Sequence, residues 1–185
     1  HWVIEHIQDI EHVSEDLFPG ILKTARMGYD GKGQETVKDL AQLKAAWERF
    51  GKVPCVLEKK LPLAYEVSAL VARGSDDQVK AFPLAENRHT DGILHLSIVP
   101  APSIDATTEA RILEAASAII RCLEYVGVLC VEFFILKDGS VVSNEIAPRP
   151  HNSGHHTMDS CVTSQFEQQV RAMARLPLGD VNLLS

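Results

Sequence analysis

One stretch decides the fold: Val128-Leu-Cys-Val-Glu-Phe-Phe-Ile-Leu-Lys-Asp-Gly-Ser-Val-Val-Ser-Asn-Glu145. Asp-Gly between two apolar runs predicts a β-hairpin. If Asp-Gly is a two-residue loop, Lys137 pairs with Ser140 and, further along the strands, Glu132 faces Glu145. Opposed like charges are unfavourable on a sheet, and Mg²⁺ would remove the repulsion because it prefers oxygen ligands. The hairpin therefore predicts a metal site, and the alternative is a ribbon with a solvated polar face.

The composition is that of an ordinary globular protein. Of the 185 residues, 45% are hydrophobic and 23% are charged, which suits one domain or two small subdomains with a core. The net charge of −7 argues against a general nucleic-acid-binding surface. No apolar run approaches the roughly 20 residues of a membrane span. The four cysteines form no Cys-x-x-Cys pair, so we expect a reducing compartment and a cytoplasmic protein.

Hydrophobic periodicity and turn residues predict the remaining elements. Thr36 is the expected N-cap of a helix over residues 37–50, and Asp105 that of a helix over residues 106–125. A last helix is expected over residues 163–175. Strands are expected over residues 20–24, 53–59, 64–73 and 78–84. This order indicates an α+β fold, because a regular alternation of strand and helix is absent.

A glycine-rich loop, Gly28-Tyr-Asp-Gly-Lys-Gly-Gln34, follows the strand that contains Lys23. Small residues let the backbone approach a ligand, and consecutive amides can bind phosphate oxygens. Lys23 and Lys32 would add positive charge. The loop lacks the Walker A pattern, so its composition alone favours a plain turn between strand and helix.

Three acidic or polar positions are candidates for a nucleotide pocket. Glu58 ends an apolar strand, Glu66 lies among apolar residues of another, and Glu86–Gly92 is dense in polar groups. Carboxylates there could accept hydrogen bonds from ribose hydroxyls or adenine. The alternative for each glutamate is a solvated side chain on a half-exposed strand. The alternative for the polar segment is a loop that crosses between strands.

The segment Arg149-Pro-His-Asn-Ser-Gly-His-His156 comes directly after the second glutamate of the hairpin. Arginine suits phosphate or carboxylate recognition, and histidine suits proton transfer near neutral pH. His151, His155 and His156 could also bind zinc, although no HExxH motif or cysteine pair supports this. A surface loop rich in turn-forming residues is the remaining alternative.

Several motifs, in order along the chain, resemble the ATP-grasp superfamily. Within it, the chain is most similar to the N5-carboxyaminoimidazole ribonucleotide synthetase family. The last motif is the most specific, because other ATP-grasp proteins share its Asn-Glu pair but not the whole run that follows. The matching stretches are Ile21–Thr24, Gly28–Gln34, Val56–Glu58, Tyr65–Ser68, Asn87–Leu94, Tyr125–Val128 and Asn144–His155.

The resemblance implies an ATP-grasp fold, in which two α+β subdomains grip ATP. Residues 1–60 would form a partial small subdomain with the phosphate loop, and residues 61–185 the large subdomain with the metal-binding hairpin. The implied enzyme is a ligase of purine biosynthesis that carboxylates aminoimidazole ribonucleotide with ATP and bicarbonate, through carboxyphosphate. The family's N-terminal domain and small C-terminal domain have no counterpart here. We therefore expect a chain truncated on its N-terminal side, which binds nucleotide weakly and does not turn over by itself.

The resemblance also implies roles for individual residues. Glu132 and Glu145 would bind Mg²⁺, and Lys23, Arg149 and His151 would be catalytic. The residues assigned to ATP are Lys23, Gly28, Tyr29, Asp30, Gly31, Lys32, Gly33, Gln34, Glu58, Lys59, Lys60, Leu61, Glu66, His89, Asn144 and Glu145. The residues assigned to bicarbonate and the imidazole substrate are Tyr29, Lys32, Arg149, His151, Asn152 and Ser153.

Other functions stay open at this point. The chain could be another ATP-grasp carboxylate–amine ligase, a biotin-carboxylase-like enzyme or a nucleotide-binding module without turnover. A zinc-dependent hydrolase that uses the histidine segment is a further alternative. The family resemblance suggests a homodimer, and we expect neither nucleic-acid nor membrane partners.

Overall fold

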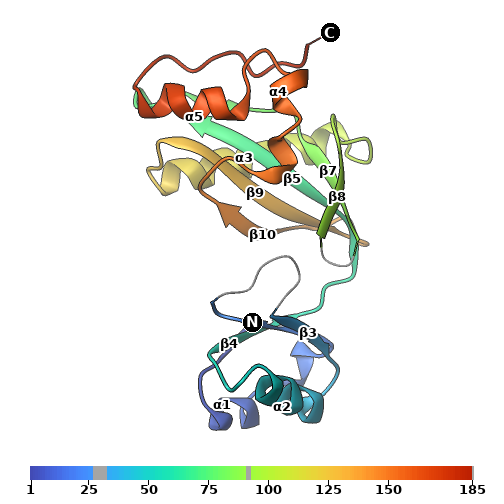
Figure 1. The fold of residues 1–185 in the computed structure, drawn as a ribbon. Coiled ribbons are helices and arrows are strands. Elements are labelled where there is room, and N and C mark those ends of the chain that lie inside the picture. Colours follow the sequence, from blue (N-terminus) through green and yellow to red (C-terminus); the bar gives the residue numbers. More distant parts are fainter. Residues whose placement is uncertain (27–32, 91–92, 185) are drawn as a thin grey trace. The chain divides into compact units, whose positions relative to one another are not determined.

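The computed structural model describes residues 1–26, 33–90 and 93–184. These residues form two compact units, the first made of residues 1–62 together with Ile93 and the second of the remaining described residues from Leu63 onward. Figure 1 shows the helices and strands of both units. Each unit combines an antiparallel sheet with helices, and the predicted α+β class is confirmed.

The first unit is built on a four-stranded antiparallel sheet in the order β1-β4-β2-β3. Its strands are β1 (Trp2–Ile4), β2 (Gly20–Thr24), β3 (Gln34–Val37) and β4 (Cys55–Lys59), and its helices are α1 (Ile7–Glu11), η1 (Glu15–Leu17) and α2 (Leu40–Arg49). Side chains alternate between the two faces of a strand. Leu22 and Leu57 are therefore fully buried in the core that includes α2, and Lys23 and Glu58 point to the opposite face.

Helix α2 begins three residues later than predicted. Thr36 is not its N-cap: it lies in β3, and the neighbouring Val37 is fully buried and pairs with Gly20 of β2. The actual N-cap is Asp39, whose carboxylate accepts from the backbone N–H of Gln42 at 2.8 Å. The helix starts later because the β-branched Val37 belongs to the sheet and Asp39, two residues further on, is a good N-cap.

The second unit is built on a six-stranded sheet in the order β10-β9-β5-β7-β8, with β6 paired to β5. Its strands are β5 (Leu63–Arg73), β6 (Val79–Ala81), β7 (Ala85–Thr90), β8 (Ile93–Ile98), β9 (Gly127–Leu136) and β10 (Val141–Ala147). Its helices are α3 (Ala106–Cys122), η2 (Asn152–Gly154), α4 (Thr157–Ser160) and α5 (Gln165–Met173). The strand predicted over residues 78–84 is present as β6 but is shorter than predicted. In the polar segment that follows, residues 86–90 belong to β7, so this part is a strand and not a loop.

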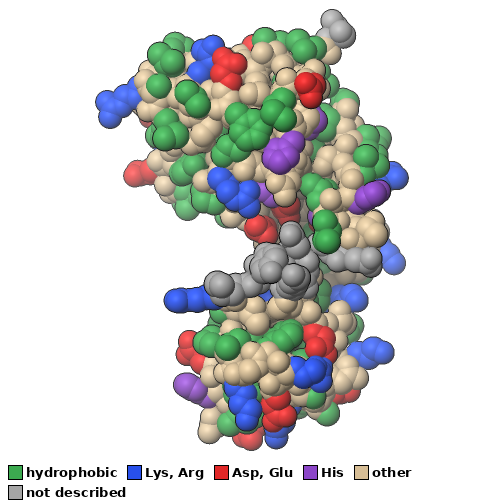
Figure 2. Space-filling view, viewed as in Figure 1, with side chains coloured by type: hydrophobic (Ala, Val, Ile, Leu, Met, Phe, Trp, Pro, Cys, Tyr) green, Lys and Arg blue, Asp and Glu red, His purple; other side chains and the backbone are tan. Residues whose placement is uncertain are grey.

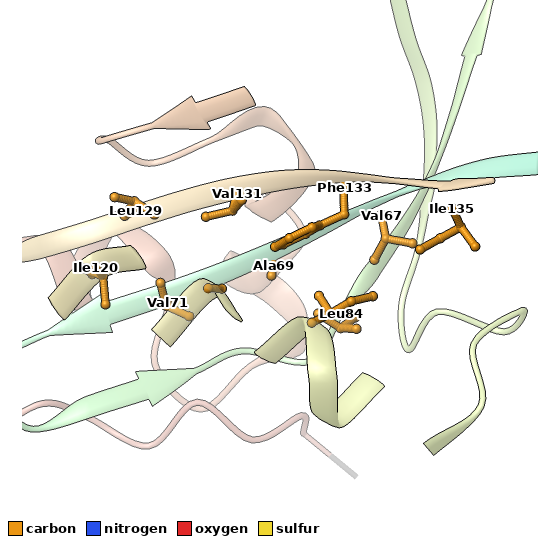
Figure 3. Packing of buried hydrophobic residues seen from close by; sticks show 11 residues of the cluster. Val67, Ala69, Val71, Leu84, Ile120, Leu129, Val131, Phe133 and Ile135 are labelled. Carbon is orange, nitrogen blue, oxygen red and sulfur yellow. The ribbon is translucent and has the colours of Figure 1, made fainter. Parts of the chain in front are cut away.

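The two faces of this sheet pack against different helices. On one face, α3 contributes Ile112, Ala116 and Ile120 to a core with odd-numbered residues of β5 and β9, and Figure 3 shows this packing. On the other face, Ala172 of α5 packs against Ala72 and other even-numbered positions. Each fully buried aliphatic side chain contributes about 1.5–3 kcal/mol relative to exposure. The sheet is therefore fixed from both sides, and the second face also carries the polar residues described below.

Helix α5 carries several exposed apolar side chains. Phe166, Val170 and Met173 are spaced along one side of the helix, and Val170 and Met173 are 62% and 71% exposed. Figure 2 shows hydrophobic side chains, in green, at the surface of this unit. Among the described residues, no helix has the length and apolar character needed to cross a membrane.

Candidate functional site

The β9–β10 hairpin brings Glu132 opposite Glu145, as the sequence predicted. The predicted two-residue loop, however, is wrong. The backbone N–H of Leu136 donates to the carbonyl of Ser140 at 2.9 Å, so the loop has three residues. Its last residue, Gly139, has a φ of 82°. Glycine adopts this left-handed conformation readily because it has no Cβ, and a three-residue hairpin loop needs it there.

A β-bulge restores the register beyond the turn. Ser143 lies opposite Phe133, but the next pair is Glu145 with Glu132, which leaves Asn144 as the extra residue on β10. A regular ladder would put Asn144 opposite Glu132 and turn Glu145 to the other face. The bulge therefore decides that the two carboxylates meet.

Glu132 lies in an environment that disfavours its charge. Its side chain is only 14% exposed. Burial raises the pKa of Glu132, and the charges of Glu145 and Glu66 raise it further. The side-chain amide of Asn144 donates to Glu132 Oε2 at 3.4 Å and acts in the opposite direction. A divalent cation between the two carboxylates would remove this repulsion.

The donor set at the hairpin fits Mg²⁺. The part of the chain that the structure describes has no cluster of three or more His, Cys, Asp or Glu side chains suited to a metal. Mg²⁺ does not need one, because it is usually bound by one or two carboxylates and completes its shell with water and substrate phosphates. Glu132 and Glu145 supply such a pair of carboxylates.

The same face of the sheet carries further polar residues. Ser68 of β5 pairs with Glu132, so Glu66, two residues earlier, points to the same side. Asn87 of β7 pairs with Glu66. Two residues beyond Asn87, His89 Nδ1 lies 3.2 Å from Glu66 Oε2. Residues that are far apart in the sequence thus form one polar face around Glu132.

The segment after β10 brings His151 beside the hairpin. Its Nε2 lies 3.5 Å from Glu132 Oε1. Burial, followed by the charge of Arg149, lowers the pKa of His151 to about 4, so the ring is neutral at pH 7. Arg149 and Asn152 are exposed on either side of this buried histidine. The segment therefore offers a neutral imidazole and an accessible guanidinium next to the acidic pair.

The zinc hypothesis finds no support among the described residues. The three histidines have different neighbours instead of a shared centre. His155 stacks on Phe166 with ring centroids 5.7 Å apart, and His156 Nδ1 lies 2.7 Å from Ser160 Oγ. His151 is the only one of the three whose ring is recorded beside Glu132 in the described structure.

In the first unit, Lys23 is already engaged. Its Nζ donates to Glu58 Oε2 at 2.6 Å across the neighbouring strands β2 and β4. Both side chains are partly exposed, at 34% and 42%. Lys59 and Lys60, which follow Glu58, are exposed, and Leu61 is partly buried. Side chains alternate along β4, so Lys59 points to the opposite face from Glu58, and the ion pair is the feature of the face that carries Lys23.

Only two residues of the predicted phosphate loop are described. Gly33 has a φ of 74° and its carbonyl accepts from the backbone N–H of Thr24 at 2.8 Å. Gln34 pairs with Lys23 in the sheet. The other predicted members lie outside the described residues: Gly28, Tyr29, Asp30, Gly31 and Lys32.

Sequence reasoning gave no role to three polar residues that support the polar face around Glu132, namely Ser68, Asn87 and Gln165. Asn87 Nδ2 donates to Ser68 Oγ at 2.6 Å, and both side chains are buried. Gln165, the first residue of α5, is fully buried and hydrogen-bonded to the backbone of His151. Ser68 and Asn87 lie in stretches that resemble the family but were given no role, and nothing local pointed to Gln165.

The geometry agrees with what comparison with known proteins finds. The sequence profile of the ATP-grasp domain matches residues 1–166. The chain belongs to the ATP-grasp family. One relative is the N5-carboxyaminoimidazole ribonucleotide synthase of Brucella melitensis biotype 1, 49% identical over 165 residues, which are 88% of this chain and 45% of the relative.

Solved structures of such synthetases have the same fold. An ADP complex of N5-carboxyaminoimidazole ribonucleotide synthetase is 44% identical and superposes with a TM-score of 0.91 over 98% of this chain and 48% of that one. The Aspergillus clavatus synthase, in complex with ADP and 5-aminoimidazole ribonucleotide, is 28% identical with a TM-score of 0.87 over the same shares. The chain spans about half the length of the proteins it matches. The predicted ATP-grasp fold is confirmed.

Proposed function

We propose that this chain is the ATP-grasp portion of an N5-carboxyaminoimidazole ribonucleotide synthase. Such an enzyme uses ATP and bicarbonate to carboxylate aminoimidazole ribonucleotide. The observation that carries the proposal is the Glu132–Glu145 pair on the same sheet face as Glu66 and His89, because paired carboxylates suit a complex of Mg²⁺ with a nucleotide. The names of the relatives, and the ADP and aminoimidazole ribonucleotide bound to one of them, support the choice of substrates.

Glu132 and Glu145 would hold Mg²⁺, and the amide of Asn144 would orient Glu132. When bound, the cation neutralises charge on the phosphates of the nucleotide, which is the main requirement of phosphoryl transfer. Lys23 would contact the phosphates as a point charge, exchanging its bond to Glu58 for one to the nucleotide. Glu66 would accept hydrogen bonds from the ribose.

Other residues would contact the remaining substrates. The exposed guanidinium of Arg149, two residues before His151, suits the bicarbonate anion. The exposed amide of Asn152 directly follows His151 in the same segment. Ser153 is only 1% exposed, so we assign it to the support of this segment instead of contact with substrate. Tyr29 and Lys32 stay predictions from the sequence.

Two broader expectations belong to the same proposal. A cytoplasmic enzyme of purine biosynthesis keeps its cysteines reduced, and the four cysteines here are all free. The homodimer stays a prediction, which sedimentation of the purified chain would test. A monomer at all concentrations studied would contradict it for this chain.

Calorimetric titration of the chain with Mg·ADP tests the nucleotide site. We expect heat of binding for the wild type and loss of its Mg²⁺ dependence in Glu132→Gln and in Glu145→Gln. Glu114→Gln, an exposed position on α3, is the matched control and should bind as the wild type does. No binding by the folded wild type would contradict the proposal. Because we do not expect the chain to turn over by itself, the substrate is tested in a full-length version. Stimulation of its ATP cleavage by biotin instead of aminoimidazole ribonucleotide would contradict the choice of substrate.

A further inference from the structure

The backbone of His151 is held at two points by one side chain. Gln165 Oε1 accepts from the backbone N–H of His151 at 2.9 Å, and Gln165 Nε2 donates to the carbonyl of His151 at 2.8 Å. Gln165 is fully buried and its own backbone N–H donates to Thr157 Oγ1 at 3.0 Å. Paired hydrogen bonds of a buried amide fix both the position and the direction of the peptide they bind.

The ring of His151 is held separately, by Ser153. The backbone N–H of Ser153 lies 3.4 Å from His151 Nδ1, and Ser153 Oγ lies 2.9 Å from the same atom. A backbone N–H can only donate, so Nδ1 accepts and carries no proton. In the neutral imidazole the proton is then on Nε2, the atom that lies 3.5 Å from Glu132 Oε1.

Gly154, in the same segment, is closely packed. A Cβ at this position would clash with Leu70 Cδ2 and lie 2.7 Å from Gln165 Oε1, so a larger residue would displace the amide that holds His151. Thr157 Oγ1 donates to the carbonyl of Gly154 at 2.6 Å and ties the segment to α4. The contacts of His151 therefore belong to a rigid support beneath the polar face.

We propose that Gln165 and Ser153 are positioning residues that hold His151 as its Nε2–H tautomer, with that N–H directed at Glu132. His151 then acts as a neutral hydrogen-bond donor that orients a carboxylate, and not as the base that its residue type suggested. Asn144 donates to Oε2 of the same carboxylate, so both oxygens of Glu132 have a donor beside them. The consequence for nucleotide binding rests on the proposed function, whereas the tautomer does not.

The chain contains a matched control for Gln165. Gln168 lies in the same helix, is equally buried, and holds another backbone residue in the same way. Its Oε1 accepts from the N–H of Gly179 at 2.8 Å, and its Nε2 donates to the carbonyl of Gly179 at 2.9 Å. Gln165→Glu and Gln168→Glu thus remove the same kind of donor from the same helix, but only the first touches His151.

Nuclear magnetic resonance of the chain with isotope-labelled histidine tests the proposal near neutral pH. The His151 ring signals are assigned by their absence in His151→Gln. We expect a single Nε2–H tautomer in the wild type and in Gln168→Glu. We expect a mixture of both tautomers in Gln165→Glu and in Ser153→Pro, which removes both the backbone N–H and the hydroxyl beside Nδ1. An Nδ1–H tautomer or a mixture in the wild type would overturn the proposal. So would an unchanged tautomer in Ser153→Pro, which also decides the matter if Gln165→Glu does not fold.

Calorimetry with Mg·ADP separates this proposal from the function. If Gln165 orients Glu132 through His151, Gln165→Glu should weaken Mg·ADP by about 10-fold and Gln168→Glu should not, because residues behind a ligating carboxylate typically have effects of this size. Equal weakening in both variants would overturn the positioning role. If the wild type binds no Mg·ADP but shows the single tautomer, the proposed function is refuted and the proposed tautomer of His151 still stands.

Discussion

The two sheets of this protein each place a pair of charged side chains on one face, and the pairs differ in kind. In the first unit, Lys23 and Glu58 have opposite charges and lie 2.6 Å apart on neighbouring strands. In the second, Glu132 and Glu145 have like charges and lie opposite each other on a hairpin. The charges of the first pair compensate each other, whereas in the second pair burial and then the charge of Glu145 raise the pKa of Glu132. The uncompensated negative charge of Glu132 and Glu145 therefore indicates that this pair, and not Lys23–Glu58, is the one that a bound cation would stabilise.

The difference follows from where each pair lies. Half-exposed opposite charges in solvent attract weakly, so Lys23 can leave Glu58 at little cost. Glu132 is mostly buried, and burial strengthens its repulsion from Glu145. A bound cation would change the energetics of the second region far more than those of the first. Each of the following substitutions either changes the charges of one pair to resemble the other pair or removes a contact that only one pair has.

The largest effect is expected when the like pair becomes an opposite pair. Glu145→Lys would place a cation against Glu132 and occupy the place proposed for Mg²⁺. We expect the affinity for Mg·ADP to fall by at least about 100-fold, or about 2.7 kcal/mol, in a calorimetric titration. Glu114→Lys, which makes the same change of charge on the exposed side of α3, should bind as the wild type does. Equal affinities of the two variants would show that the pair is not the cation site.

A smaller loss of Mg·ADP affinity is expected when the β-bulge is kept but the side-chain amide of Asn144 is removed. Asn144→Ala removes the donor that lies 3.4 Å from Glu132 Oε2. We expect Mg·ADP binding to weaken by about 10-fold, since partners of ligating carboxylates commonly matter to this extent. Ser143→Ala, at the exposed neighbouring position, is the control. Similar affinities for Asn144→Ala and Ser143→Ala would contradict the role of the amide.

Removing the charge of Glu132 should stabilise the fold at neutral pH. A folded-state pKa above the unfolded value means that the carboxyl stabilises the fold below its ordinary pKa of 4.5, and that this contribution is lost as the pH rises through the folded-state pKa. Glu132→Gln should therefore raise the free energy of unfolding at neutral pH by roughly 1 kcal/mol, the usual size of single-residue effects. The gain should vanish below pH 4.5. Urea denaturation at both pH values measures it, and a gain that is independent of pH would contradict this origin.

The smallest effect concerns the opposite pair of the first unit. A double-mutant cycle with Lys23→Met and Glu58→Gln should give a coupling of about 0.2–1 kcal/mol in the free energy of unfolding, because solvent screens partly exposed pairs. Urea denaturation of the four proteins measures it. A coupling well above this range would mean that Lys23 is too firmly held to exchange Glu58 for a phosphate.

The Asp-Gly turn led to the correct prediction that Glu132 lies opposite Glu145, although the hairpin reaches this register in a different way. Gly139 takes the left-handed conformation of a three-residue loop, which shifts the register by one, and the bulge at Asn144 shifts it back. Neither shift has a sequence signal strong enough to recognise, since Asp-Gly is compatible with both loop lengths. The pair was found because the two deviations cancel.

Long-range polar contacts explain what local patterns missed. The polar segment that begins at Glu86 was open to a loop interpretation, yet Asn87 is buried in β7 because Ser68 and Ser97, on two other strands, bind its amide. Gln165 has the same kind of explanation, since its partner, the backbone of His151, lies in the segment between β10 and α4. A periodic pattern reports which face of an element is apolar, but it does not report which distant partner satisfies a buried polar group.

The bulge at Asn144 has one more consequence, because β10 lies at one edge of the described sheet. A straight outer strand presents a row of free amides and carbonyls on which a foreign chain can continue the sheet, and this is a common route to aggregation. An extra residue interrupts that row and twists it away from any would-be neighbour. The irregularity that sets Glu145 in place therefore also protects the rim of the sheet against unwanted extension.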